Sequence, residues 1–96
     1  MTKHIVAPLF PLGQIVATPG AVVEMANANQ EAKYFIGLHL RLDKGCLDAS
    51  DHAQNKLALK LGNRIFSAFK TNLGAKLWVI TEADRSSTCI LLPEEY

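Results

Sequence analysis

Two carboxylates and an arginine stand close together in the segment TEADRSST, residues 81–88. Glu82 and Asp84 are two positions apart, so they would share one face if a strand continued through them. Neighbouring carboxylates can divide acid and base roles or bind a hard cation. We expect Arg85 to pair with one of these acids. Since Asp, Arg and Ser are ordinary turn residues, the first interpretation of this segment is a polar hairpin connection.

A second group of polar residues lies in the middle of the chain. His39 and Asp43 are four positions apart, which is metal-ligand spacing if a helix continues that far, and Asp51 or His52 would supply a third ligand. A His–Asp pair that fixes the end of the helix is the favoured alternative. The two cysteines show no CxxC spacing. We therefore predict neither a metal site nor a cofactor.

Asn55 and Arg64 complete the set of candidate residues. Arg64 follows the glycine that ends a predicted helix, and we expect it to reach the last carbonyls of that helix, Asp51 or Asn55. If such groups meet beside an apolar pocket at one end of a sheet, they form a ligand-binding or catalytic site. The candidate site comprises His39, Asp43, Asp51, Asn55, Arg64, Glu82, Asp84 and Arg85.

No strong catalytic signature accompanies these residues. The chain has no glycine-rich phosphate loop, no GxSxG and no HExxH. Its serines at 67, 86 and 87 have no histidine or lysine nearby in the sequence to act as a base. A binding protein is therefore favoured over an enzyme.

Three helices are expected to precede the sheet. Thr18 is a good N-cap with Pro19 at the first helical position, which predicts a helix over 19–28. The second helix is predicted over 30–40, and the third over 49–61, capped by Asp48 or Ser50 and ended by Gly62. The side chains expected to face the core are Val22, Val23, Met25 or Ala26 in the first helix, Tyr34, Phe35, Leu38 and Leu42 in the second, and Ala53, Leu57 and Leu61 in the third.

From residue 64 onward the apolar period changes to two, which is typical of strands. RIFSAFK, AKLWVIT and TCILL read as three antiparallel strands, and residues 13–17 are a candidate fourth. We predict an α+β fold in which two to three N-terminal helices pack on a C-terminal antiparallel meander of three strands, or four with residues 13–17. We expect residues 1–96 to form a single domain and residues 1–12 to form an extended arm, because Pro8 and Pro11 resist regular structure.

Composition limits the class of partner. Hydrophobic residues make up 49% of the 96 and the net charge is +1, with lysines and arginines spread along the chain, which disfavours nucleic-acid binding. So much apolar residue in a small chain predicts a homo-oligomer, most simply a dimer. Cys46 and Cys89 are expected to be buried free thiols in a reducing compartment, the cytoplasm, since no signal peptide or membrane span is evident.

Four stretches, FPLGQIVATPGA, HLRLDKGCLDASDHAQN, ALKLGNRIFSAF and KLWVITEADRSSTCILLPEEY, together resemble a family of small uncharacterised proteins of plasmids, phages and other mobile elements. Members are often labelled plasmid-related, and some are labelled type I restriction endonuclease subunit M. The resemblance spans about residues 10–96. It implies an accessory protein of a mobile element, such as an integron cassette product, that acts by protein–protein interaction. Action against a host defence would be one instance.

The family pattern in the middle segment is H-x-x-G-D-W-G-x-L followed by an acid and an asparagine. The matching positions here are His39, Asp43, Gly45, Leu47, Asp51 and Asn55. Leu42 and Lys44 depart from the pattern, because the family has glycine and tryptophan there. The run from Thr81 to Ser86 and Arg64 also match. The resemblance implies no established activity. A small-ligand-binding or enzymatic domain, with its site between the middle loop and the TEADRS hairpin, is the alternative function.

Overall fold

The computed structural model of the chain describes residues 9–96, so most of the predicted N-terminal arm, residues 1–8, lies outside the described range. Residues 9–13 belong to neither a helix nor a strand. The regular elements are β1 (Gln14–Ala17), α1 (Pro19–Asn27), α2 (Ala32–Leu40), α3 (Ala49–Leu61), β2 (Ile65–Lys70), β3 (Lys76–Thr81), β4 (Ser87–Leu91) and a short 3₁₀ turn, η1 (Pro93–Glu95). The predicted α+β fold, with helices before an antiparallel meander, is confirmed.

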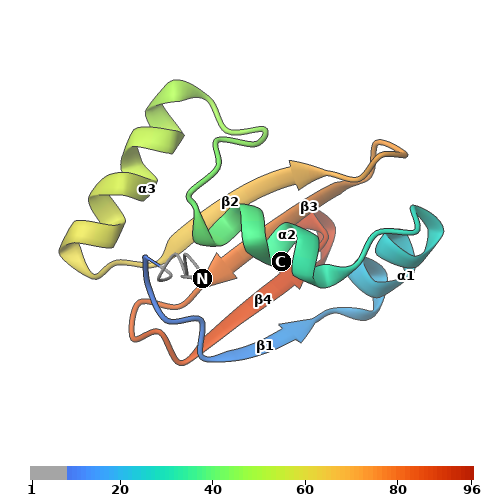
Figure 1. Ribbon diagram of the computed structural model, residues 1–96, viewed down its shortest axis with the longest axis horizontal. Coiled ribbons are helices and arrows are strands. Elements are labelled where there is room, and N and C mark those ends of the chain that lie inside the picture. The colour runs from blue at the N-terminus through green and yellow to red at the C-terminus, as the bar shows by residue number, and fades with distance from the viewer. Residues whose placement is uncertain (1–8) are drawn as a thin grey trace, which may run out of the picture.

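The sheet has four strands in the order β1-β4-β3-β2 (Figure 1). β2, β3 and β4 form the antiparallel meander, and β1 lies parallel to β4. The candidate fourth strand therefore joins the sheet and makes it mixed. Its parallel partner is possible because the whole helical region and two strands separate β1 from β4 along the chain.

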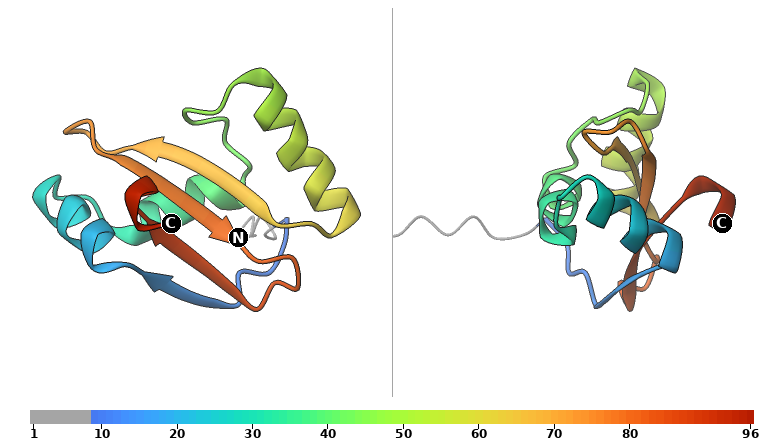
Figure 2. Two further views of the ribbon diagram at one scale, coloured as in Figure 1. Left: turned by 180° about the vertical axis from the view of Figure 1, so that it is seen from behind. Right: turned by 90° about the vertical axis from the view of Figure 1, so that its right-hand side faces the viewer.

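The strand register divides the sheet into two faces. Ile65, Thr81 and Thr88 stand opposite one another, so their side chains share one face. We call this the covered face, because α1 and α2 lie over it (Figures 1 and 2). Its core unites the helices and the sheet through the buried residues Ala21, Met25, Phe35, Ile36, Phe69, Leu77, Val79 and Ile90.

Within residues 9–96 the opposite side of the sheet carries no α-helix; Figure 2 shows the C-terminal 3₁₀ turn on this side. We call it the open face. Its apolar side chains are Val16, Phe66, Ala68, Trp78, Ile80, Cys89 and Leu91. Phe66 and Trp78 meet edge to face, with ring centroids 5.0 Å apart, and Tyr96 packs against Trp78 at 5.8 Å. The C-terminal residue therefore covers part of this apolar surface, on which Ala68, Ile80 and Leu91 are buried whereas Phe66, Trp78 and Cys89 are half-buried.

α1 begins as the sequence predicts but buries a different stripe. The Thr18 hydroxyl accepts from the N–H of Ala21, with Pro19 at the first helical position. Ala21 and Met25 are the buried residues, one turn apart, whereas the predicted core residues Val22 and Val23 are about half exposed. The prediction for these valines is wrong, since the short helix turns only its i and i+4 positions toward β4 and α2.

α2 and α3 also differ from their predicted stripes. α2 buries Phe35, Ile36 and His39 and leaves Tyr34 exposed, because its sheet-facing stripe is rotated by one residue. The predicted bounds of α3 are confirmed, and Asp48 is its N-cap. Since α3 lies beside the β2 edge (Figure 1), it buries only Asn55 and Ala58. The predicted core residues Ala53, Leu57 and Leu61 are exposed, so that prediction is wrong.

Candidate functional site

The candidate residues occupy four separate environments. His39 lies inside the core, and Asp43 lies in the loop between α2 and α3. Asp51, Asn55 and Arg64 line a groove between α3 and β2. Glu82, Asp84 and Arg85 belong to the β3–β4 connection. The structure thus brings together three of the eight side chains in one pocket.

His39 is completely buried between its own helix, α2, and the strands β2 and β3. Its Nδ1 atom lies 2.7 Å from the Ser67 hydroxyl and its Nε2 atom 2.8 Å from the Thr81 hydroxyl. The Thr81 hydroxyl lies 2.7 Å from that of Thr88, which donates to the Leu12 carbonyl at 2.8 Å. The predicted pair between His39 and Asp43 is therefore wrong, because the α2 stripe points the imidazole into the sheet.

The direction of this chain of hydrogen bonds fixes the state of the ring. Thr88 uses its only proton on a carbonyl, so it accepts from Thr81, which in turn accepts from His39 Nε2–H. Nδ1 of the neutral ring then accepts from Ser67. Burial lowers the pKa of His39 to about 4, which keeps the ring neutral at pH 7. Although no histidine lies near Ser67 in the sequence, the fold places His39 next to its hydroxyl in the protein interior.

The loop after α2 is held against the β2 edge. Asp43 accepts from the Gly45 N–H at 3.0 Å, and the Cys46 N–H donates to the Ala68 carbonyl at 2.7 Å. Leu42 has a left-handed backbone, φ 54°, the conformation that favours glycine. Its side chain is buried in a second cluster with Phe10, Ala58 and Ile65.

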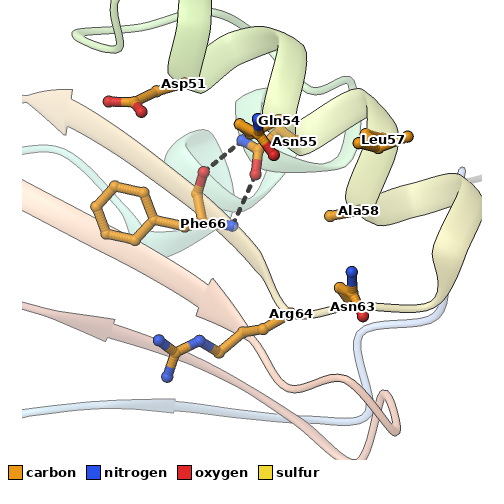
Figure 3. A pocket seen from close by; sticks show the side chains of 8 residues that line it. All are labelled: Asp51, Gln54, Asn55, Leu57, Ala58, Asn63, Arg64 and Phe66. Carbon is orange, nitrogen blue, oxygen red and sulfur yellow. Dashed lines mark hydrogen bonds between the residues drawn. The ribbon is translucent and has the colours of Figure 1, made fainter.

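The groove between α3 and β2 has a volume of about 330 Å³ (Figure 3). We call it the α3–β2 groove, and it is lined by Asp51, Gln54, Asn55, Leu57, Ala58, Asn63, Arg64 and Phe66. It combines one carboxylate, one guanidinium and three carboxamides with apolar walls. Such a surface has the chemistry to hold a small polar molecule.

The carboxamide of Asn55 forms its hydrogen bonds within the protein. Its carboxamide donates to the Phe66 carbonyl, and its oxygen accepts from the Phe66 N–H at 2.9 Å (Figure 3). One side chain thus replaces a neighbouring strand at the edge of the sheet. Asn55 shapes the groove, and its two hydrogen-bonding groups face β2.

Arg64 points away from α3, across the sheet (Figure 3). Its guanidinium lies 5.6 Å from the centre of the Tyr96 ring, within cation–π range. The expectation that Arg64 reaches Asp51 or Asn55 is therefore wrong, since residue 64 precedes β2 and directs its side chain toward the open face. Asp51 lies exposed in the first turn of α3.

Arg85 connects the β3–β4 hairpin to the end of α3. Its Nη1 donates to the carbonyls of Asn63, Glu82 and Ala83 at 2.7, 3.1 and 3.2 Å. Within residues 9–96 the ion pairs are Lys33–Glu31 and Arg41–Asp43, so the expected pairing of Arg85 with an acid is wrong. Its left-handed backbone, φ 61°, turns the side chain back over its own loop.

The two acids of the hairpin are exposed. Asp84 accepts from the Ser86 N–H at 2.9 Å. Hydrogen bonds from the Ser86 hydroxyl and N–H lower the pKa of Asp84. Glu82 closes the hairpin, with its N–H donating to the Ser87 carbonyl at 3.0 Å. The hairpin interpretation of this segment is confirmed.

Both thiols are free, but the expectation that both are buried is wrong, because Cys46 is exposed. Cys89 lies half-buried on the open face, where desolvation and the carboxylates of Glu95 and Glu82 raise its pKa. The described residues contain no cluster of three His, Cys, Asp or Glu side chains that could hold a metal ion. Within residues 9–96, no helix has the length and apolar character needed to span a membrane.

Sequence reasoning missed the partners of His39. Ser67, Thr81 and Thr88 are fully buried, and two of them fall on the alternating face that the sequence assigns to Ile65, Phe69, Leu77 and Val79. A hydroxyl at a core position needs a hydrogen-bond partner. Serine and threonine at buried strand positions therefore indicated that a polar side chain from another element lies beside them. The remaining groove residues, such as Gln54 and Asn63, carried no comparable signal because they are exposed.

Comparison of the chain with protein-family models, with curated proteins and with solved structures finds no match.

Proposed function

We propose that this protein is an accessory protein of a mobile genetic element that acts in the cytoplasm by binding another protein through its open face. The mobile-element context rests on the sequence resemblance. Occlusion of a host restriction or CRISPR component is the instance that this context favours.

The observation that carries the proposal is the open face itself. A β-sheet in a small domain is normally covered on its apolar side by helices or a second sheet. Here Phe66, Trp78 and Cys89 are only half-buried, and Tyr96, the residue that packs on Trp78, is itself 68% exposed. Aromatic side chains in such a position are frequent centres of binding energy.

Charge at one end of the open face indicates the chemistry of the partner. Lys70 and Lys76 stand opposite each other on β2 and β3, on the same face as Trp78, and both are exposed. Like charges opposite each other in a sheet repel, and a carboxylate from a partner would relieve the repulsion. We therefore infer a partner with an apolar patch bordered by acidic side chains.

A charge-reversal experiment tests this proposal. The tagged double variant K70E/K76E is compared with wild type in affinity capture from host cells, and K56E/K60E on α3 is the matched control because it makes the same charge change at exposed positions. We expect a partner that wild type and K56E/K60E retain and K70E/K76E loses at least ~10-fold. Equal capture by all three proteins would contradict the proposed surface.

The α3–β2 groove supports a second candidate, a small-ligand-binding or enzymatic domain. Its volume of about 330 Å³ is at the lower end of the roughly 300–1,000 Å³ range of small-molecule sites. The substitutions D51N and R64Q remove its two charges. If a metabolite panel raises the melting temperature of wild type but not of these variants, the groove is a ligand site.

A further inference from the structure

The two edges of the sheet differ in whether their outward backbone groups form hydrogen bonds. At the β2 edge, Asn55 binds both backbone groups of Phe66, and the Cys46 N–H binds the Ala68 carbonyl. This edge is closed to any further strand. Natural sheets protect their edges in this way because an unpaired edge recruits other chains.

The β1 edge has no such protection within residues 9–96. The N–H groups of Gln14 and Thr18 point inward and donate to Ser86 and Ile90 carbonyls, each at 3.0 Å. Alternation along the strand therefore directs the backbone groups of Ile15 and Ala17 outward. β1 pairs only with β4 among the described strands. It contains neither a proline nor a charged residue that would oppose pairing.

The surroundings of this edge are apolar and uncharged. Residues 13–23 contain no charged side chain, although 20% of the whole chain is charged. Ile15, Val16, Val22 and Val23, which lie on β1 and the following helix α1, are between 42% and 54% exposed. The exposed valines of α1, which do not join the core, thus belong to the same segment as the open strand.

We propose that a second copy of this chain adds its β1 strand antiparallel to β1, across a two-fold axis at Val16. A two-fold axis brings each residue near it next to its own copy, so a charge there would meet a like charge. Because residues 13–23 contain no charged side chain, no like charges would meet at this axis. This favours a second copy of the chain as the partner that pairs with the β1 edge.

The register follows from the outward groups. Ile15 pairs with the partner's Ala17, and Ala17 with the partner's Ile15, which gives four main-chain hydrogen bonds. Val16 then faces the partner's Val16 in the closer, non-hydrogen-bonded position. The result is one continuous sheet, with the four strands of each copy side by side.

This dimer has a consequence for partner binding. The axis between two antiparallel strands is perpendicular to the sheet, so the open faces of both copies lie on the same side. A partner with two equivalent sites would bind both faces at once and gain avidity. Because a four-residue strand buries less than the roughly 800 Å² per partner of a standard interface, we expect dissociation in the micromolar range.

Sedimentation velocity over a range of protein concentrations tests the proposal. Wild type should pass from monomer to dimer, whereas V16K should raise the dissociation constant at least ~100-fold, because two lysines meet at the axis. L73K is the control, since Leu73 is also exposed but lies in the β2–β3 turn. It should dimerise like wild type.

A mixture of V16K and V16E gives the sharper result. Each variant alone should be monomeric and retain the wild-type circular dichroism spectrum, and the mixture should form a heterodimer because opposite charges meet at the axis. If wild type stayed monomeric at concentrations up to ~1 mM, far above the expected micromolar dissociation constant, the proposal would be overturned. Dimerisation of V16K equal to that of wild type, or V16K and V16E that stay monomeric when mixed, would also overturn it.

Discussion

The imidazole of His39 combines complete burial with two hydroxyl partners, Ser67 and Thr81. The T-shaped contact with Phe10, 5.3 Å between ring centroids, adds an apolar wall. In this setting, protonation would place a charge on a ring whose hydrogen-bond partners among residues 9–96 are the two hydroxyls and no carboxylate. The neutral ring therefore joins α2 to β2 and β3 through hydrogen bonds. It lowers the stability of the fold only at a pH low enough to protonate it.

We predict that stability depends on pH through this residue. The pKa of His39 is about 4 in the folded protein against 6.5 for an ordinary histidine. The unfolded chain binds the proton more tightly, so the free energy of unfolding is highest above pH 6.5 and falls as the pH drops toward 4. The loss should reach about 3 kcal/mol. Urea unfolding at a series of pH values measures it.

The variant H39Q is the control for this prediction. Glutamine can donate and accept hydrogen bonds but does not titrate, so its unfolding free energy should be lower at pH 7 and nearly constant between pH 6.5 and 5. If wild type and H39Q lost stability in parallel over this interval, the assignment to His39 would be wrong.

At the scale of single residues, the sequence identified polar side chains but not their partners. Local partners were expected for both His39 and Arg85, yet both bind groups far along the chain, Thr81 and the Asn63 carbonyl. Spacing along a helix predicts only local pairs such as His39 and Asp43. Which residue a side chain meets across 20 or 40 positions depends on the register of the sheet, which the sequence does not specify.

At the scale of elements, glycine has two different effects in this chain. Gly45 has φ +53°, and a Cβ there would overlap the Ala68 carbonyl oxygen and the Phe69 ring. G45A should therefore destabilise the protein by about 2–4 kcal/mol through backbone strain and overpacking. Gly37 lies inside α2, and apart from its chain neighbours and the backbone of its own helix, no atom of residues 9–96 lies within 4 Å of its Cβ position. G37A should stabilise by about 0.5–1 kcal/mol.

Thermal and urea unfolding of the two variants check this pair of predictions. Because the substitution is the same, a difference of sign isolates the role of the loop contact with β2. A G45A protein as stable as G37A would show that the loop moves away from the strand without cost.

Asn55 provides the second prediction at this scale. N55A leaves the N–H and C=O of Phe66 without their partner at the β2 edge. We expect a loss of about 2–3 kcal/mol in unfolding free energy, together with faster amide exchange at Phe66. Q54A is the control, since Gln54 lines the same groove from an exposed position. Its effect should stay within about 0.5 kcal/mol. Equal effects of N55A and Q54A would contradict the edge role of Asn55.

The order and bounds of the elements were predictable, because caps and breakers are local signals. Thr18, Asp48 and Gly62 all act as the sequence indicates. The buried faces of the helices were less predictable. α3 has leucines at Leu57 and Leu61, but its position beside an edge strand allows only Asn55 and Ala58 to be buried. An apolar stripe identifies a core-facing side only when the helix lies across a sheet.

At the scale of the whole molecule, the C-terminal turn is tied to the start of the helical region. The Glu95 carboxylate accepts from the Thr18 hydroxyl and from the N–H groups of Gly20 and Leu92, each N–H at 3.0 Å. This places a negative charge at the N-terminus of α1, where the helix dipole favours it. The same turn directs Tyr96 onto the open face. The hydrogen bonds of Glu95 therefore also determine how much of that face Tyr96 covers.

We therefore predict that E95Q loosens the C-terminal turn. The hydrogen bond from Thr18 and those from the backbone lower the pKa of Glu95, so its stabilising contribution is present above its ordinary pKa and is lost as the pH falls through the lower folded value. E95Q should lower the melting temperature at pH 7 and increase the fluorescence response of Trp78 to a quencher, because Tyr96 leaves its ring. E94Q is the matched control, since no hydrogen bond within residues 9–96 uses the Glu94 side chain. If E95Q and E94Q were alike in both measurements, the turn would be held by Tyr96 and Trp78 alone, and the cover over the open face would not depend on α1.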